Sequence, residues 1–95
     1  MNPVQFIKEQ FDRSGLELGR TTIVSYSEKS FGDFVAEVET MHGLLRIERE
    51  RGQCFVDYFD DTTGAFVRGD IKWPQLLPIF ESGSWSLSDL LKVLG

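Results

Sequence analysis

The stretch EVETMHGLLRIERERGQCFVDYFDD, residues 37–61, decides the fold of this chain. Apolar and charged side chains alternate through most of it, which is typical of strands that bury only one face. Glycine follows a polar residue at His42-Gly43 and at Arg51-Gly52, and glycine readily adopts the positive φ that tight hairpin loops need. The stretch therefore predicts two hairpins in one meander, with strands over 34–40, 44–50 and 53–59.

The segments on either side of the meander predict a helix near each end of the chain. Asn2 is a suitable N-cap in front of Pro3, and apolar residues recur with helical spacing after it, so we expect a helix over 3–14. Ser86 and Asp89 have the spacing of a capping box, in front of a second apolar stripe. That stripe consists of Leu87, Leu90, Leu91 and Leu94.

Two further strands and a proline-containing segment complete the expected elements. Residues 16–26 favour a strand before the meander, and residues 65–68 favour a short strand after it. Pro74 and Pro78 limit residues 73–80 to a short helical turn, because proline breaks a longer helix. The expected fold is a single α+β domain over 1–95, an antiparallel meander of four to five strands with the N-terminal and C-terminal helices packed on one face.

The composition is that of a folded domain and argues against two classes of partner. Apolar residues make up 41% of the 95 residues, and no apolar run approaches the ~20 residues that cross a bilayer. The net charge is −5, and residues 28–61 hold nine acids against four bases, while the remainder holds six of each. Nucleic acids and anionic membranes are bound through basic patches, and this chain is acidic, so neither is an expected partner.

The residues that most often carry chemistry do not form a recognisable motif. Cys54 is the only cysteine and His42 the only histidine, too few for an internal disulfide or a structural zinc site. We expect Cys54 in the core and His42 in a solvated loop. Asp57, Asp60 and Asp61 lack the spacing of a calcium loop. The sequence therefore predicts no catalytic residue, metal or cofactor. The N-terminus also lacks the features of an export signal, so we expect a cytoplasmic protein.

The side chains opposite the core are predicted to form two rows across the three strands of the meander. With two-residue loops, Glu39, Arg46 and Asp57 align in one row, and the other row places Glu37 opposite Glu48, beside Phe55. Two like charges directly opposite each other cost sheet stability, and an exposed aromatic among charges is typical of recognition surfaces. The predicted contact surface for a protein partner with a basic surface is Glu37, Glu39, Arg46, Glu48, Phe55 and Asp57.

The same positions also have an ordinary structural interpretation, as solvated strand residues without a partner. The assignment of the faces depends on register, because a slip of one residue exchanges them. Trp73 and Trp85 flank the proline-containing segment, and we interpret both as core anchors rather than as ligand platforms.

Two short stretches carry a resemblance to a known class of proteins. Residues 50–57 read ERGQCFVD, and residues 85–91 read WSLSDLL. With the N-terminal helix and the acidic meander, they resemble the small acidic α+β immunity proteins of bacterial polymorphic-toxin and contact-dependent inhibition systems. The resemblance implies a cytoplasmic protein that binds one toxin domain, often a nuclease with a basic cleft, and blocks it. It assigns no functional residue to this chain.

Two other functions are open from the sequence alone. The chain is alternatively a small cytoplasmic adaptor or regulatory domain that dimerises through an exposed strand edge near residues 65–68. An enzyme that uses Asp57 with His42 or Glu48 is disfavoured, because no acid, base and pocket are recognisable together. The sequence does not specify the oligomeric state.

Overall fold

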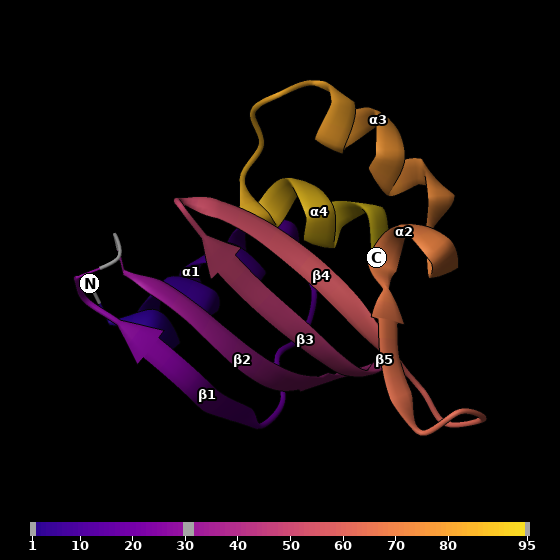
Figure 1. Cartoon of the computed structure of the whole chain (residues 1–95), viewed down its shortest axis with the longest axis horizontal. Helices are drawn as coiled ribbons and strands as arrows, with labels where there is room; N and C mark the ends of the chain where they lie inside the picture. The colour runs from indigo at the N-terminus through magenta and orange to yellow at the C-terminus, as the bar shows by residue number, and fades with distance from the viewer. Residues whose placement is uncertain (1, 30–31, 95) are drawn as a thin grey trace.

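A computed structural model describes residues 2–29 and 32–94 of the chain. Five antiparallel strands form one sheet in the order β1-β2-β3-β4-β5, and helices flank them in sequence. This arrangement confirms the expected α+β meander (Figure 1). No helix within these residues is long and apolar enough to cross a membrane. The elements are α1 (Pro3–Ser14), β1 (Thr21–Ser27), β2 (Asp33–Thr40), β3 (Gly43–Glu50), β4 (Gln53–Asp60), β5 (Ala65–Arg68), α2 (Gly69–Lys72), η1 (Pro74–Leu76), α3 (Leu77–Glu81) and α4 (Leu87–Leu94).

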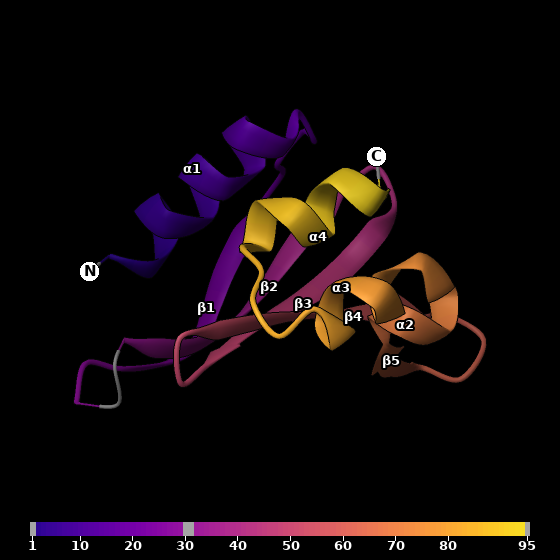
Figure 2. The same cartoon turned by 90° about the horizontal axis from the view of Figure 1, so that it is seen from above.

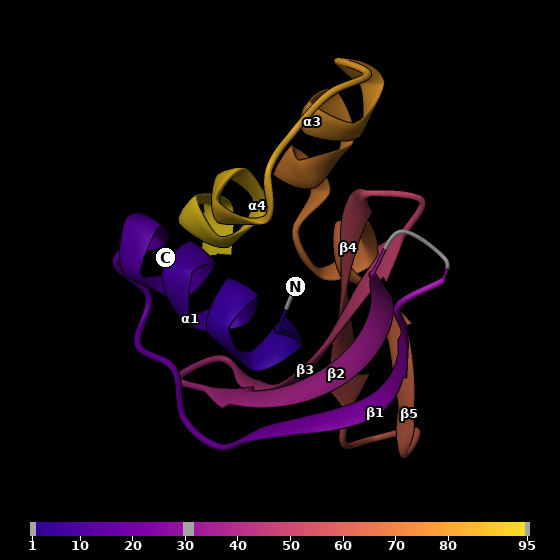
Figure 3. The same ribbon diagram turned by 90° about the vertical axis from the view of Figure 1, so that its left-hand side faces the viewer.

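Helices α1 and α4 pack side by side on one face of the sheet, as expected from the sequence (Figure 2). Figure 3 shows the curved strands β1–β3 passing beneath both helices. The two helices are joined by a buried hydrogen bond, in which the Ser88 N–H donates to Gln10 Oε1 at 2.9 Å. A polar side chain is tolerated there because its oxygen has a partner. The first and last helices therefore form one layer over the sheet.

The core lies between this helical layer and one face of the sheet. Its strand residues occupy alternate positions, as a period of two requires. Cys54 belongs to the core with 4% of its surface exposed, which confirms its predicted placement. The buried apolar residues are Ile7, Phe11, Leu16, Phe34, Ala36, Val38, Leu45, Ile47, Cys54, Val56, Trp73, Leu76, Leu87, Leu90, Leu91 and Leu94.

The β3–β4 hairpin has the predicted register. Arg51 and Gly52 both have positive φ, 52° and 81°, which is the backbone of a two-residue loop matched to the twist of the strands. Glu50 is opposite Gln53, and the pairing continues along both strands as expected. Arg51 also donates its backbone N–H to Asp33 Oδ1 at 2.9 Å, which ties this loop to the start of β2.

The β2–β3 hairpin differs from the prediction by two residues. Thr40 is opposite Gly43, so the loop is Met41-His42 rather than His42-Gly43. The Thr40 hydroxyl stabilises this loop by donating to the Gly43 carbonyl and accepting from the His42 N–H, each at 3.0 Å. Gly43 follows with a φ of 93°, as in the common hairpin connection that ends on a left-handed residue. A shift of two residues keeps both faces but changes every cross-strand partner.

Strand β1 begins later than expected, at Thr21 instead of residue 16. The backbone of Glu39 bonds two consecutive residues, accepting from the Gly19 N–H at 2.8 Å and donating to the Arg20 carbonyl at 2.9 Å. The two-against-one bonding at Glu39 locally disrupts the ladder at this end of β1. Gly19 also has no room for a Cβ, because that atom would lie 2.8 Å from the Glu39 carbonyl oxygen. The preceding residues approach the core without forming a strand, and Leu16 is buried there.

Helix α4 begins with the reciprocal cap that the sequence predicts. The Ser86 N–H donates to Asp89 Oδ2 at 2.8 Å, and the Asp89 N–H donates to the Ser86 hydroxyl at 3.2 Å. The bond from the Ser86 backbone lowers the pKa of the Asp89 carboxyl below its ordinary value. Two backbone donors at the helix start are thereby satisfied.

The segment between β5 and α4 holds more helix than the sequence suggests. The sequence predicts only a short helical turn within residues 73–80, but α2 already starts at Gly69, and η1 and α3 follow it. Pro74 and Pro78 each occupy the first turn of a helical segment, where the missing N–H of proline has no helical acceptor in any case. The prolines therefore divide this segment into short helices instead of excluding them.

We predict that α4 is essential for stability. Leu91 is completely buried, so Leu91→Ala should lower the free energy of unfolding by about 2–5 kcal/mol through lost contacts and the cavity left behind. Lys92 is exposed on the same helix, and Lys92→Ala is the matched control, with an expected change within ~0.5 kcal/mol. Urea unfolding measures both. Equal midpoints for wild type and Leu91→Ala would show that α4 does not hold the core.

Candidate functional site

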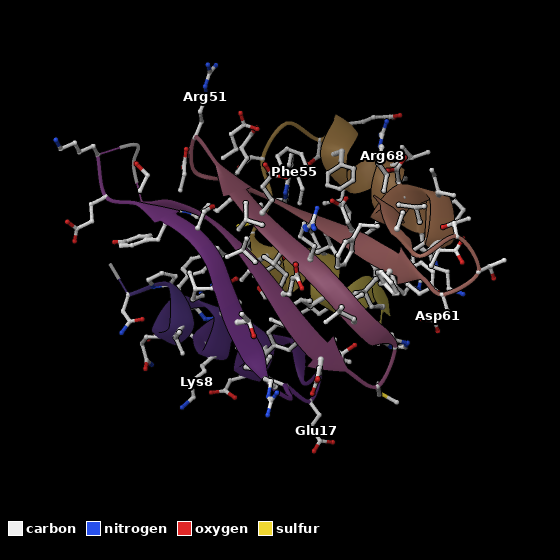
Figure 4. All side chains as sticks on the ribbon, turned by 60° about the horizontal axis from the view of Figure 1, so that its bottom comes forward. Lys8, Glu17, Arg51, Phe55, Asp61 and Arg68 are labelled. Carbon is white, nitrogen blue, oxygen red and sulfur yellow. The ribbon has the colours of Figure 1, made fainter. Side chains whose placement is uncertain are left out.

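The face of the sheet opposite α1 and α4, which we call the open face, is turned toward the viewer in Figure 4. It carries a row of alternating charges. Glu37 on β2 is directly opposite Arg46 on β3, which is opposite Asp57 on β4. Asp57 is in turn opposite Arg68 on β5. Opposite charges on facing strands stabilise a sheet modestly. The row is thus a structural feature as well as a charged surface.

This register corrects the predicted pairing of Glu37 with Glu48. Glu37 pairs with Arg46, whose Nη2 lies 3.6 Å from Glu37 Oε2, and Glu48 is flanked by Val35 and Phe55. The hairpin loop causes the difference, because Met41-His42 rather than His42-Gly43 sets the partners of β2 and β3. The proposed cost of two facing acids therefore does not exist, and it supplies no argument for function.

A pocket of about 470 Å³ opens at the end of the open face, where β5 ends and α2 begins. Its volume falls in the range of pockets that hold small ligands. Carboxylates dominate its polar lining, one arginine accompanies them, and two phenylalanines supply its apolar wall. The lining residues are Glu48, Glu50, Phe55, Val56, Asp57, Arg68, Gly69, Asp70 and Phe80.

The two phenylalanines of the apolar wall belong to a cluster of three aromatic rings, whose third member, Trp85, packs behind them and does not line the pocket. The ring centroid of Phe55 lies 5.7 Å from that of Phe80 and 5.8 Å from that of Trp85, and Phe80 and Trp85 are 5.1 Å apart. The indole Nε1–H of Trp85 donates to the Cys54 carbonyl at 2.8 Å, which fixes the cluster to β4. Such mutual contacts give the rings a defined orientation. Trp85 is therefore a packing residue, as predicted.

Gly69 allows the helical side of the pocket to form. A Cβ at this position would clash with the Val56 carbonyl oxygen of β4, so only glycine lets α2 approach the strand this closely. Beyond Gly69, Asp70 holds Arg68 through two hydrogen bonds, from Nε to Oδ1 at 3.0 Å and from Nη2 to Oδ2 at 3.1 Å. This two-point contact positions the guanidinium group at the pocket.

The three remaining carboxylates of the pocket have no such partner. Within the part of the chain that the structure describes, the side chains of Glu48, Glu50 and Asp57 form neither a hydrogen bond nor an ion pair at contact distance. Partial burial raises the pKa of Asp57 above its ordinary value, although Arg46 and Arg68 oppose the shift. A cation in the pocket would offset this loss of hydration.

Arg46, in contrast, is held by contacts within the protein. Its guanidinium carbon lies 4.1 Å from the ring centroid of Phe66 on β5, a cation–π contact, and it also pairs with Glu37. Its Nε is buried without a hydrogen-bond partner among the described residues. Arg46 therefore contributes to the packing of the open face as well as to its charge.

The structure brings together only part of the predicted contact surface. Glu48, Phe55 and Asp57 line the pocket, and Glu37 and Arg46 continue the charge row away from it. Glu39 lies apart, because it is opposite Leu44 and its backbone bonds the segment before β1.

Sequence reasoning missed four polar or aromatic residues of the pocket. Glu50 lies two residues after Glu48 on β3, so the alternation of the strand already places it on the same face. Arg68 could have been found by pairing β5 with β4, because Arg68 is then opposite Asp57. Asp70 and Phe80 carried no signal, because they reach the pocket only through the path of α2 and α3.

His42 is not the solvated loop residue that the sequence predicts. Its ring lies 5.9 Å from that of Trp73 in an edge-to-face contact, and the residue is half-buried. Its Nε2 is buried and has no hydrogen-bond partner among residues 2–29 and 32–94. His42 does not line the pocket that holds Asp57 and Glu48. The structure therefore does not place it with the residues of the enzymatic alternative.

The remaining candidates for chemistry are the Cys54 thiol and a cluster of metal-ligating side chains. Burial raises the pKa of the Cys54 thiol to about 11, so this group is protonated and weakly nucleophilic at neutral pH. Among the described residues, no cluster of three or more His, Cys, Asp or Glu side chains has the arrangement of a metal site.

We predict that the charge of Asp57 costs stability. A carboxyl whose pKa is raised by folding destabilises the folded state when it is ionised, so Asp57→Asn should raise the melting temperature at pH 7. The difference should shrink as the pH falls through the pKa of folded Asp57, because the wild-type carboxyl then becomes neutral. Calorimetry at several pH values from about 3 to about 7 measures the two melting temperatures. Glu39→Gln, at an exposed carboxylate, is the control. A lower melting temperature for Asp57→Asn at pH 7 would contradict it.

Comparison of the chain with protein-family models, curated proteins and solved structures gives no match. The geometry of the open face and its pocket is therefore the basis on which a function is assigned.

Proposed function

We propose that this chain is a binding protein that recognises a basic protein partner through the open face, with the pocket beside Phe55 receiving a lysine or arginine side chain. The observation that carries the proposal is the pocket itself, which combines unpartnered carboxylates with an aromatic wall. Carboxylates attract a cation, and an aromatic face next to them favours a guanidinium or ammonium group. Arginine matches this combination best, because its planar group pairs with carboxylates and stacks on rings.

The charge distribution supports the same proposal over a longer range. Residues 28–61, which supply β2, β3 and β4, carry the whole net negative charge of the chain. An acidic surface accelerates encounter with a basic partner, while a well-packed aromatic anchor site slows dissociation. Phe55 and Phe80 have the properties of such an anchor site, since both are half-buried aromatics at the pocket.

The class of partner that we propose is a bacterial toxin domain in the cytoplasm. This part of the proposal rests on the resemblance to immunity proteins, and a nuclease with a basic cleft would complement the acidic open face. The alternative is a cytoplasmic adaptor whose partner has a basic segment. Both use the same pocket, and we assign catalysis to neither.

The pocket can be tested without knowing the partner. N-acetyl-arginine amide, followed by NMR, should shift the amide signals of Phe55, Asp57 and Gly69 in a saturable manner, with a dissociation constant on the order of 1 mM. The citrulline analogue has nearly the same shape without the charge and should cause no saturable shift. The double variant Glu48→Gln, Asp57→Asn should weaken binding roughly ten-fold, whereas Glu39→Gln outside the pocket should leave it unchanged. Equal titrations with both amides would rule out a cation pocket.

The toxin hypothesis requires a functional measurement. A toxin domain encoded next to this gene should arrest growth when expressed alone and permit growth when this chain is co-expressed. Glu48→Lys with Asp57→Lys should slow association and reduce its dependence on salt, and Phe55→Ala should speed dissociation. Surface plasmon resonance at low and high salt measures these rates, and circular dichroism confirms folding. Unchanged rates in a folded double variant would place the partner site elsewhere.

A further inference from the structure

We infer that the basic segment of the partner extends across the sheet and places a second lysine or arginine side chain in a second pocket, over β1, β2 and β3. The inference rests on the proposed function, because it adds a subsite on the same open face to the pocket beside Phe55. The second pocket, which we call the Ser25 pocket, has a volume of about 280 Å³. Its open-face lining consists of Ser25, Ser27, Asp33, Val35, Glu48 and Glu50.

One row of residues across the sheet joins the two pockets. Ser25 on β1 is opposite Val35 on β2, which is opposite Glu48 on β3. Glu48 is in turn opposite Phe55 on β4. Ser25 and Val35 line the Ser25 pocket, Phe55 lines the other pocket, and Glu48 and Glu50 line both. The two pockets are thus the halves of one groove, with a pair of carboxylates between them.

A bulge in β1 gives the Ser25 pocket its shape. The ladder with β2 is regular up to Ile23 and resumes at Ser25, so Val24 is an extra residue. An extra residue exchanges the faces of the residues that follow it, because strand side chains alternate. Ser25 and Ser27 therefore lie on the open face, while the large Tyr26 belongs to the helical side. The two small side chains leave room for the pocket.

Carboxylates determine the charge of the Ser25 pocket. Its acids are Asp33, Glu48 and Glu50, and within the part of the chain that the structure describes none of them forms an ion pair at contact distance. Arg49 also lines the pocket, but its charged group lies on the helical side of the sheet. There its guanidinium carbon is 5.4 Å from the ring centroid of Phe6 on α1. The Ser25 pocket is therefore complementary to a cation.

The groove as a whole carries more negative charge than one cation can balance. Four carboxylates line it without an ion-pair partner among residues 2–29 and 32–94, those of Asp33, Glu48, Glu50 and Asp57. A single arginine in the pocket beside Phe55 supplies one positive charge and leaves most of this charge unbalanced. A second cation from the same partner segment would reduce the remainder.

The spacing of the pockets suits two basic residues of one extended segment. The Ser25 pocket spans β1 to β3, and the other pocket spans β3 to the start of α2, so their middles lie over β2 and β4. Two strand spacings are about 10 Å. In an extended segment, alternate side chains point to the same face about 7 Å apart, and the length of two arginine side chains covers the difference. We therefore assign the two cations to residues i and i+2 of the segment.

Two peptides that differ in one arginine test the inference by NMR. Acetyl-Arg-Ala-Arg-amide should bind roughly ten-fold more tightly than acetyl-Arg-Ala-Ala-amide, because its second contact is intramolecular. It should also shift the amide signals of Ser25 and Val35 with the same midpoint as those of Phe55 and Gly69. If the one-arginine peptide binds but the second arginine adds less than about two-fold in affinity, the inference is overturned while the proposed function stands. If neither peptide binds, the proposed function fails and the inference fails with it.

Variants of the Ser25 pocket locate the second arginine. Asp33→Asn removes a charge but keeps the oxygen that accepts the Arg51 N–H. It should weaken the two-arginine peptide roughly five-fold and change the affinity of the one-arginine peptide by less than about two-fold. Ser25→Lys should fill the pocket with a tethered cation and remove the gain from the second arginine. Thr22→Lys is the matched control, on the same strand and face, opposite Glu37 and outside both pockets.

The matched lysine variants separate the pocket from the general effect of charge. Both Ser25→Lys and Thr22→Lys add one positive charge to β1, so long-range repulsion of a basic peptide is similar in the two. The larger loss of affinity for the two-arginine peptide should occur in Ser25→Lys. Equal losses in the two variants, with folding confirmed by circular dichroism, would overturn the inference.

Discussion

The burial of one face of the sheet under α1 and α4 is the constraint on which the rest of the molecule depends. Strand side chains alternate in direction, so covering Ala36, Ile47 and Val56 leaves every intervening side chain on the opposite face. On these strands, most charged side chains therefore occupy the positions that the helices do not cover. The open face is therefore a consequence of the core, and its acidic character follows from residues excluded from the helical side.

Strand β4 connects the core with the pocket. Cys54 and Val56 are buried beneath the helices, while Phe55 and Asp57 point to the pocket from the same strand. The carbonyl groups of the two buried residues also position its walls: that of Cys54 accepts the Trp85 indole bond, and that of Val56 lies against Gly69. A change that moves β4 in the core would thus alter the pocket, and experiments on the pocket need controls for folding.

The open face contains two kinds of charge, which have different physical roles. Glu37 pairs with Arg46 across β2 and β3, and the Arg46 guanidinium stacks on Phe66, so these two charged groups help to hold the sheet. Glu48 and Glu50 lack such partners, and Asp57 is ionised only at a cost in hydration. These three carboxylates are the second kind of charge, and they make the surface suited to receive a cation, because a bound cation would supply the partner that they lack.

The sequence by itself determined the elements formed by short-range patterns: the alternating strands of the meander, the Arg51-Gly52 loop, the capped helices and the buried position of Cys54. It also assigned the open face correctly, because the error at the first loop was two residues and an even shift preserves the faces. Only the tertiary structure decided that Glu37 pairs with Arg46 and that Asp70 and Phe80 complete the pocket. These contacts depend on the loop that the Thr40 hydroxyl selects and on the close approach of Gly69 to β4. The second is a contact between distant parts of the chain, which no local period or capping pattern encodes.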